Sequence, residues 1–151
     1  MMKKKIIWLV LTLIWAGVIF SFSAKTADES SNESRRVGKF ICSIFVSGYD
    51  ELDETAQYEL AGKIEYPIRK MAHMAEYAVL GFLLMGFMEN VIISFLAGAI
   101  YAATDEIHQY FVPGRSCQIT DVLIDSFGVI IGILIFIIIV KLHRKWRGYH
   151  Q

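Results

Sequence analysis

The chain has 151 residues, of which 55% are hydrophobic, with equal numbers of acidic and basic residues and a positive mean hydropathy. This length fits a single domain, residues 1–151, and the hydrophobicity indicates a membrane protein. No basic run with interleaved aromatic residues is present, which argues against nucleic acid as a partner. Two cysteines, Cys42 and Cys117, are too few for a disulfide framework or a structural zinc site.

Four apolar stretches are each long enough to cross a bilayer as a helix, and they cover residues 6–22, 71–88, 91–111 and 122–140. We therefore predict an all-α membrane protein with four transmembrane helices. The first stretch follows three lysines and ends in Ser21-Phe22-Ser23-Ala24, which is also typical of a cleaved signal peptide. The length of this stretch and its two tryptophans favour an uncleaved anchor.

The one long polar segment, residues 23–69, separates the first two spans. Residues 23–34 have the composition of a flexible loop. An apolar stripe with helical spacing follows: Val37, Phe40, Ile41, Ile44 and Phe45. This stripe, next to basic residues, predicts a short helix that lies in the membrane interface and shields the mouth of a pocket.

Residues 50–63 predict a second, acidic helix in the same segment. Asp50 or Asp53 is the expected N-cap, and Gly62 is expected near the end of the helix. Pro67 is then expected to break the chain before the second span, because proline has no backbone N–H to donate.

The distribution of charge predicts the orientation of the spans. Seven basic residues lie near the two termini, and an even number of spans places both termini on one side. By the positive-inside rule that side is cytoplasmic, so residues 23–69 and the Pro113 turn are extracytoplasmic. All the acidic residues except Glu89 then lie outside or at the outer ends of helices.

Polar residues gather at the predicted outer ends of the last three spans. They are Arg69, Lys70, His73 and Glu76, then Asp105, Glu106, His108 and Gln109, then Arg115, Asp121 and Asp125. Ionisable groups at membrane depth are costly and usually functional, so this clustering predicts an outward-facing pocket. Helical spacing places Asp105 and His108 on one face and Glu106 roughly opposite.

Several chemistries fit this set. Two histidines with carboxylates suit Zn²⁺ or Mn²⁺, although their spacing matches no dedicated metal motif and no cofactor follows from the sequence. Acid–base catalysis is a second interpretation, with Asp105, His108, Asp121 and Asp125 as the candidate catalytic residues. In a third, Arg69, Lys70 and Arg115 hold an anionic head group. The alternative to all three is that the charges only neutralise one another and join the helices. The Gly128-x-x-x-Gly132 spacing of the last span allows a neighbouring helix to approach closely.

Three polar motifs in this order resemble the VanZ-like family of bacterial membrane proteins. They are RKMAHMAEY (69–77), YAATDEIHQYFVPGRS (101–116) and TDVLIDSFG (120–128), and SFSAK (21–25) adds to the likeness. Cys117-Gln118 departs from the small residues that usually follow the second motif.

The resemblance implies a multi-pass protein of the bacterial plasma membrane with an association with teicoplanin resistance. The expected function is recognition of a cell-wall precursor or anionic lipid head group, with a glycopeptide as a further possible partner. The alternatives are a membrane-embedded hydrolase or transferase acting on a lipid-linked phosphate, and a structural or assembly partner. Neither the sequence nor the resemblance gives an oligomeric state.

Overall fold

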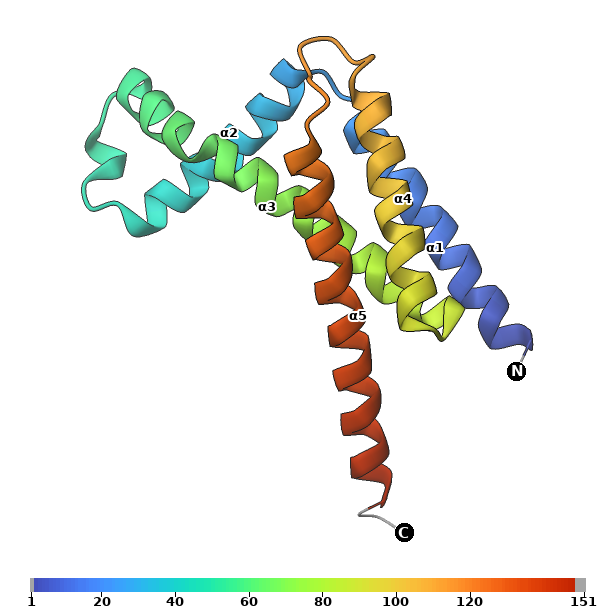
Figure 1. The fold of residues 1–151 in the computed structure, drawn as a ribbon. Helices are drawn as coiled ribbons and strands as arrows, with labels where there is room; N and C mark the ends of the chain where they lie inside the picture. Colours follow the sequence, from blue (N-terminus) through green and yellow to red (C-terminus); the bar gives the residue numbers. More distant parts are fainter. Residues whose placement is uncertain (1, 149–151) are drawn as a thin grey trace.

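The computed structural model describes residues 2–148, and over that range every regular element is helical (Figure 1). The elements in chain order are α1 (Met2–Ser23), α2 (Ala27–Phe45), the 3-10 helix η1 (Tyr49–Glu51), α3 (Glu54–Met88), α4 (Val91–Gln109) and α5 (Ile119–Gly148). Helices α1, α3, α4 and α5 are long and apolar enough to cross a membrane. The prediction of an all-α chain with four candidate spans is therefore confirmed.

The predicted boundaries are less accurate than the predicted elements. The second span, expected at residues 71–88, is only the later part of α3, which begins at Glu54. Pro67 lies inside this helix, so the expected break is wrong, and Gly62 does not end a helix. A proline removes one backbone hydrogen bond and crowds the preceding turn. Here α3 contacts α2 on both sides of Pro67, through Glu65 and Arg69, and the helix continues. Asp53 does cap α3, since its carboxylate accepts from the Ala56 N–H at 2.7 Å.

The segment expected to be a flexible loop, residues 23–34, is mostly helical, because α2 begins at Ala27. Thr26 and Glu29 form a capping box: the Thr26 hydroxyl accepts from the Glu29 N–H, and the Glu29 carboxylate accepts from the Thr26 N–H. These hydrogen bonds to Thr26 hold the pKa of Glu29 below its usual value. The prediction of a loop is wrong because polar residues after a cap extend a helix as readily as they form a loop.

Helix α2 and residues 54–66 of α3 pack side by side and extend away from the other helices, and we call this pair the arm (Figure 1). Gly38 permits the contact, because a Cβ there would lie 3.0 Å from the Ala61 carbonyl oxygen. An ion pair between Arg35 and Glu65, at 2.9 Å, joins the two helices at the base of the arm.

The expected apolar stripe of α2 is present, but it faces away from this contact. Phe40 and Phe45 are 66% and 80% exposed. Ala27 is the one residue of α2 that lines the pocket described below. The expectation that residues 37–45 shield the mouth of that pocket is therefore wrong, while their position relative to a bilayer stays a prediction.

The spanning helices meet around a small apolar core of Ile19, Tyr77, Leu80, Leu84, Ala102, Val129 and Ile133. Helices α3 and α5 come into backbone contact beside it. A Cβ on Gly128 or Gly132 would collide with the carbonyl oxygen of Met74 or Ala78 in α3. The close approach predicted from the Gly-x-x-x-Gly spacing is confirmed, and it fixes the register between two of the helices that carry the polar residues.

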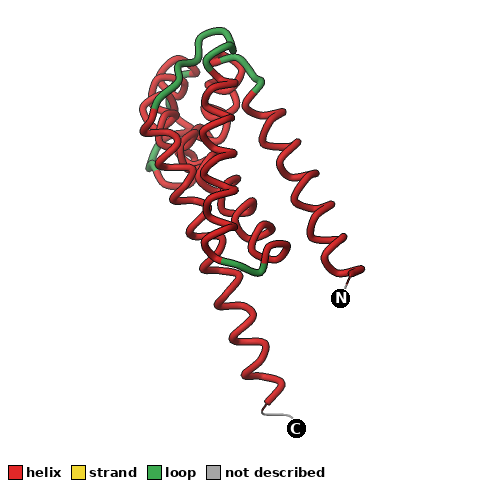
Figure 2. The backbone as a smooth tube through the Cα atoms, turned by 45° about the vertical axis from the view of Figure 1, so that its right-hand side comes forward, coloured by secondary structure: helices red, strands yellow, loops and turns green. Residues whose placement is uncertain are grey.

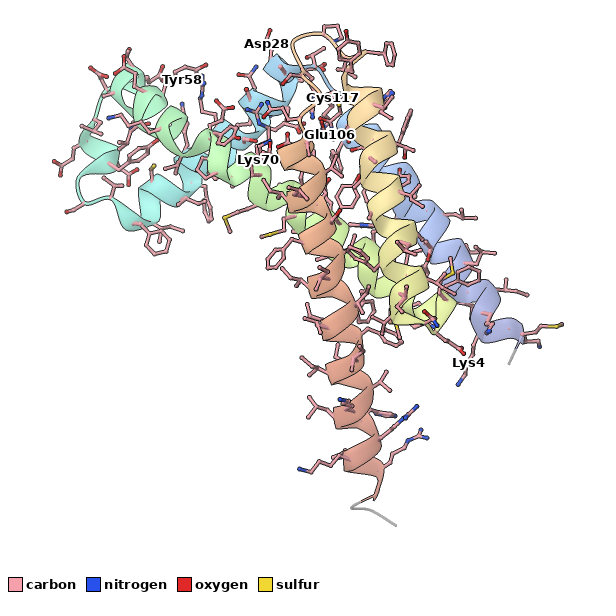
Figure 3. The ribbon with its side chains drawn as sticks, in the orientation of Figure 1. Lys4, Asp28, Tyr58, Lys70, Glu106 and Cys117 are labelled. Carbon is pink, nitrogen blue, oxygen red and sulfur yellow. The ribbon has the colours of Figure 1, made fainter. Side chains whose placement is uncertain are left out.

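The two ends of the bundle differ in composition. Figure 2 shows the α1–α2 connection and the α4–α5 loop together at the end away from the two termini. In Figure 3, Lys70, Glu106 and Cys117 lie at that end and Lys4 lies at the other. The short α3–α4 turn is also at Lys4's end, where Glu89 faces Lys5 at 4.0 Å.

Candidate functional site

A partly open pocket with a volume of about 110 Å³ lies at the end of the bundle that carries the α4–α5 loop. Its walls come from α3, α4, α5 and this loop, with one residue from the start of α2. The lining residues are Ala27, Tyr66, Arg69, Lys70, His73, Glu106, Gln109, Gly114, Arg115, Ser116, Gln118, Asp121, Ile124 and Asp125. Eight of the eleven candidate site residues thus surround one cavity; Glu76, Asp105 and His108 do not line it.

The α4–α5 loop reaches the pocket through a tight turn that is fixed on α2. The Ala27 N–H donates to the Pro113 carbonyl at 3.2 Å. Gly114 has a φ of 76°, in the left-handed region that glycine adopts without strain. A Cβ on Gly114 would also press to within 3.0 Å of the Ala27 Cβ. The sequence Pro113-Gly114 therefore sets where the next residue, Arg115, enters the pocket.

Arg115 is held by neutral acceptors only. Its Nε donates to the Lys25 carbonyl at 2.9 Å and its Nη1 to Gln109 Oε1 at 3.1 Å. A longer contact of 3.4 Å joins Nη2 to the Phe22 carbonyl. Within residues 2–148 no carboxylate forms an ion pair with it. Burial lowers the pKa of Arg115 and the positive charge of Arg69 lowers it further, while the carboxylates of Asp105, Glu106 and Glu76 act in the opposite direction.

The other basic residues of the pocket already have acidic partners. Arg69 faces Glu65 at 3.6 Å and donates to Ser31 Oγ at 3.4 Å. Because Glu65 is shared with Arg35 of the arm, it only partly neutralises Arg69. Lys70 forms an ion pair with Asp121 that joins α3 to α5.

The acidic lining residues differ in how well they are satisfied. Glu106 is 2% exposed, and its carboxylate accepts from the Gln118 N–H at 2.8 Å. Asp125 is 3% exposed; it forms no hydrogen bond and no ion pair within 4 Å in the described range, but it interacts electrostatically with His73. His73 also lines the pocket, and its Nδ1 is 3.6 Å from Glu76, outside hydrogen-bond range.

Asp105 and His108 belong to a different cluster, between α4 and α1. Asp105 Oδ2 accepts from Ser23 Oγ at 2.6 Å and from Gln109 Nε2 at 3.1 Å, while Oδ1 is buried without a partner. The His108 ring stacks on Phe20 with ring centroids 4.4 Å apart. The helical spacing did separate Glu106 from this pair, but it is the face of Glu106 that lines the pocket.

Sequence reasoning missed two residues that organise this end of the bundle. Ser23 is fully buried and links α1 to Asp105, and Gln118 fixes Glu106 through its backbone N–H. The first lies in the SFSAK motif, which was a usable signal. A backbone donor such as that of Gln118 leaves no trace in the side-chain pattern.

No group of three or more His, Cys, Asp or Glu side chains in residues 2–148 is arranged to hold a metal ion. The charged side chains that line the pocket are of both signs. Such a site can bind a polar or charged group by hydrogen bonds and ion pairs, and its carboxylates could also accept a proton.

The helices and this pocket define a multi-pass helical membrane protein with a charged cavity at one end. A family model described as VanZ/LLP1 matches residues 8–140. The chain belongs to the VanZ/LLP1 family, as the three polar motifs indicated. No curated protein and no solved structure matches the chain.

Proposed function

We propose that this protein resides in the bacterial plasma membrane with the pocket facing outward, where it binds the phosphate-bearing head group of a membrane lipid or lipid-linked cell-wall precursor. The orientation rests on the basic residues at both termini, which the positive-inside rule assigns to the cytoplasm. In this topology the pocket opens at the level where head groups lie.

The observation that carries the proposal is the pair Arg69 and Arg115. Both guanidinium groups line one cavity, and Arg115 forms hydrogen bonds only with neutral acceptors. Arginine presents several N–H donors in a planar fork that matches phosphate oxygens. A phosphate between these side chains would use the N–H groups that remain.

The size of the cavity limits what it can enclose. Pockets that enclose a drug-sized ligand measure roughly 300–1,000 Å³, and this one measures about 110 Å³. A glycopeptide antibiotic cannot enter it, whereas a phosphate with a small substituent can. The resemblance to the VanZ-like family implies an effect on teicoplanin susceptibility. Such an effect would then act through the envelope lipid or precursor that the protein binds.

Binding can be tested on the purified chain in detergent by calorimetric titration with inorganic phosphate and glycerol 3-phosphate. Arg115→Gln should weaken binding at least tenfold, since hydrogen bonds to a charged group contribute about 1.5–3 kcal/mol. Arg36→Gln is the matched control, because Arg36 is exposed on α2 and does not line the pocket. Equal binding by both variants, or none by the unmodified protein, would refute the proposal.

A structural role is the second candidate, and the ion pair between Lys70 and Asp121 favours it because it joins α3 to α5 directly. Under this alternative, Asp121→Asn strands Lys70 in the bundle and lowers the thermal stability, while head-group binding does not exist. The enzymatic alternative has less support, since two of its four candidate catalytic residues, Asp105 and His108, lie outside the pocket.

A further inference from the structure

The inner end of the pocket carries a buried acidic group, Asp125, whose interaction with His73 is electrostatic and not a hydrogen bond. Asp125 is 97% buried, lines the cavity and has no hydrogen-bond or ion-pair partner within residues 2–148. A buried carboxylate without a donor is costly, and such groups are rare in folded proteins unless a ligand or water completes them. The position therefore calls for a donor that comes from outside the chain.

The charges of the pocket are ordered along its depth. Asp125 lies one helical turn, about 6 Å, further from the α4–α5 loop than Asp121 does. His73 is likewise one turn beyond Arg69 on α3. Arg115 enters from the loop itself. The guanidinium groups therefore lie toward the loop and the unsatisfied carboxylate lies toward the interior of the bundle.

The charges of the lining residues favour a ligand that carries both signs. Besides the titratable His73, three lining side chains are basic and three are acidic: Arg69, Lys70 and Arg115 against Glu106, Asp121 and Asp125. Phosphate alone would complement the guanidinium groups of Arg69 and Arg115 and leave Asp125 without a hydrogen-bond donor. A ligand that carries an anionic and a cationic group a few ångströms apart would complement both.

We infer that the ligand is a phosphate ester that also bears a primary amine, with the phosphate between Arg69 and Arg115 and the ammonium group on Asp125. This inference rests on the proposed function and specifies its ligand class. An ammonium group has three N–H donors and a positive charge, which is what a lone buried carboxylate lacks. The same chemistry is present in a free phosphoamine and in the ethanolamine head group of a lipid.

The inference can be tested on the full-length protein in detergent with three probes: phosphoethanolamine, its N-acetyl derivative and inorganic phosphate. Phosphoethanolamine should bind about tenfold more tightly than the other two, as expected for one additional hydrogen-bonded ion pair. Acetylation keeps the phosphate and removes the positive charge. Equal affinity for the amine and its N-acetyl derivative would overturn the inference and leave the proposed phosphate site intact.

Asp125→Asn keeps the size of the side chain and removes its charge. It should abolish the preference for phosphoethanolamine over its N-acetyl derivative. The matched control is Glu59→Gln, an acid-to-amide change at an exposed position of the arm that is away from the pocket. If Asp125→Asn does not fold, the three probes on the unmodified protein still decide.

The source of the amine can be identified in nanodiscs of phosphatidylethanolamine or phosphatidylglycerol. Retention of phosphatidylethanolamine alone, dependent on Asp125, identifies a lipid head group. Binding of soluble phosphoethanolamine with no lipid preference identifies a free ligand. If no phosphate compound binds in any of these assays, the proposed function and the inference both fail. If phosphate binds through Arg115 but the amine has no effect, only the inference fails.

Discussion

Replacing Gly132 by alanine is expected to destabilise the protein, because a Cβ at this position would collide with the Ala78 carbonyl of α3. The obstacle is backbone, so no side chain can turn aside and the two helices must separate. Overpacking of this kind costs about 1–3 kcal/mol, which for a chain of this size lowers Tm by roughly 3–10 °C. Helices α3 and α5 carry Lys70, His73, Asp121 and Asp125, so the separation should also widen the pocket.

Gly17→Ala is the matched control for this experiment. Gly17 also lies within a spanning helix, but nothing comes within 4 Å of the position of its Cβ. Alanine there should leave the stability unchanged or raise it by about 0.5–1 kcal/mol, because alanine favours the helix over glycine. Both Tm values would be measured in the same detergent by circular dichroism. If Gly132→Ala melts at the temperature of Gly17→Ala, α3 and α5 are not in backbone contact and the pocket walls are misplaced.

Three further outcomes follow from exposed and buried groups. In intact cells a membrane-impermeant maleimide should label Cys117, which is exposed, but not Cys42 of α2, which is only 4% exposed. Labelling of Cys117 only after lysis would contradict the outward orientation. Phe40→Trp, in a chain whose three native tryptophans are replaced by phenylalanine, should be quenched by brominated lipids if the apolar face of the arm lies in the membrane interface, and an unquenched tryptophan would place it in water. Asp105→Asn should lower the free energy of unfolding by about 1 kcal/mol, because an amide oxygen accepts the hydrogen bond from Ser23 more weakly than a carboxylate does; an unchanged Tm would show that the charge of Asp105 adds nothing to stability.

The elements of the fold were accessible from the sequence because a spanning helix has a simple signature, an uncharged apolar run of known length. The contact between α3 and α5 was accessible for a related reason, since small residues four apart mark a close helix crossing. The continuity of α3 could not be predicted from the sequence. A proline breaks many helices, and only the packing of α2, with Arg35 paired to Glu65, shows that this one continues.

The candidate site was predictable in composition but not in arrangement. Costly polar residues at one end of three helices indicate a cluster wherever the helices pack. Helical spacing separates Asp105 from Glu106, but it cannot say which of the two faces turns toward α3 and α5. That choice depends on Ser23, whose hydroxyl holds Asp105 on the side of α1 and leaves Glu106 for the pocket.

Because α3 is one continuous helix, it connects the arm directly to the bundle of spanning helices. Its 35 residues extend about 52 Å, against roughly 30 Å for the hydrocarbon core of a bilayer. The part that projects is the arm, and the residues where it meets the spanning part are those that wall the pocket. Pro67, two residues before Arg69, removes one hydrogen bond at this junction and is the natural point of bending. Arg69 on α3, and the loop that carries Arg115 and is hydrogen-bonded to Ala27 of α2, therefore both lie next to this junction.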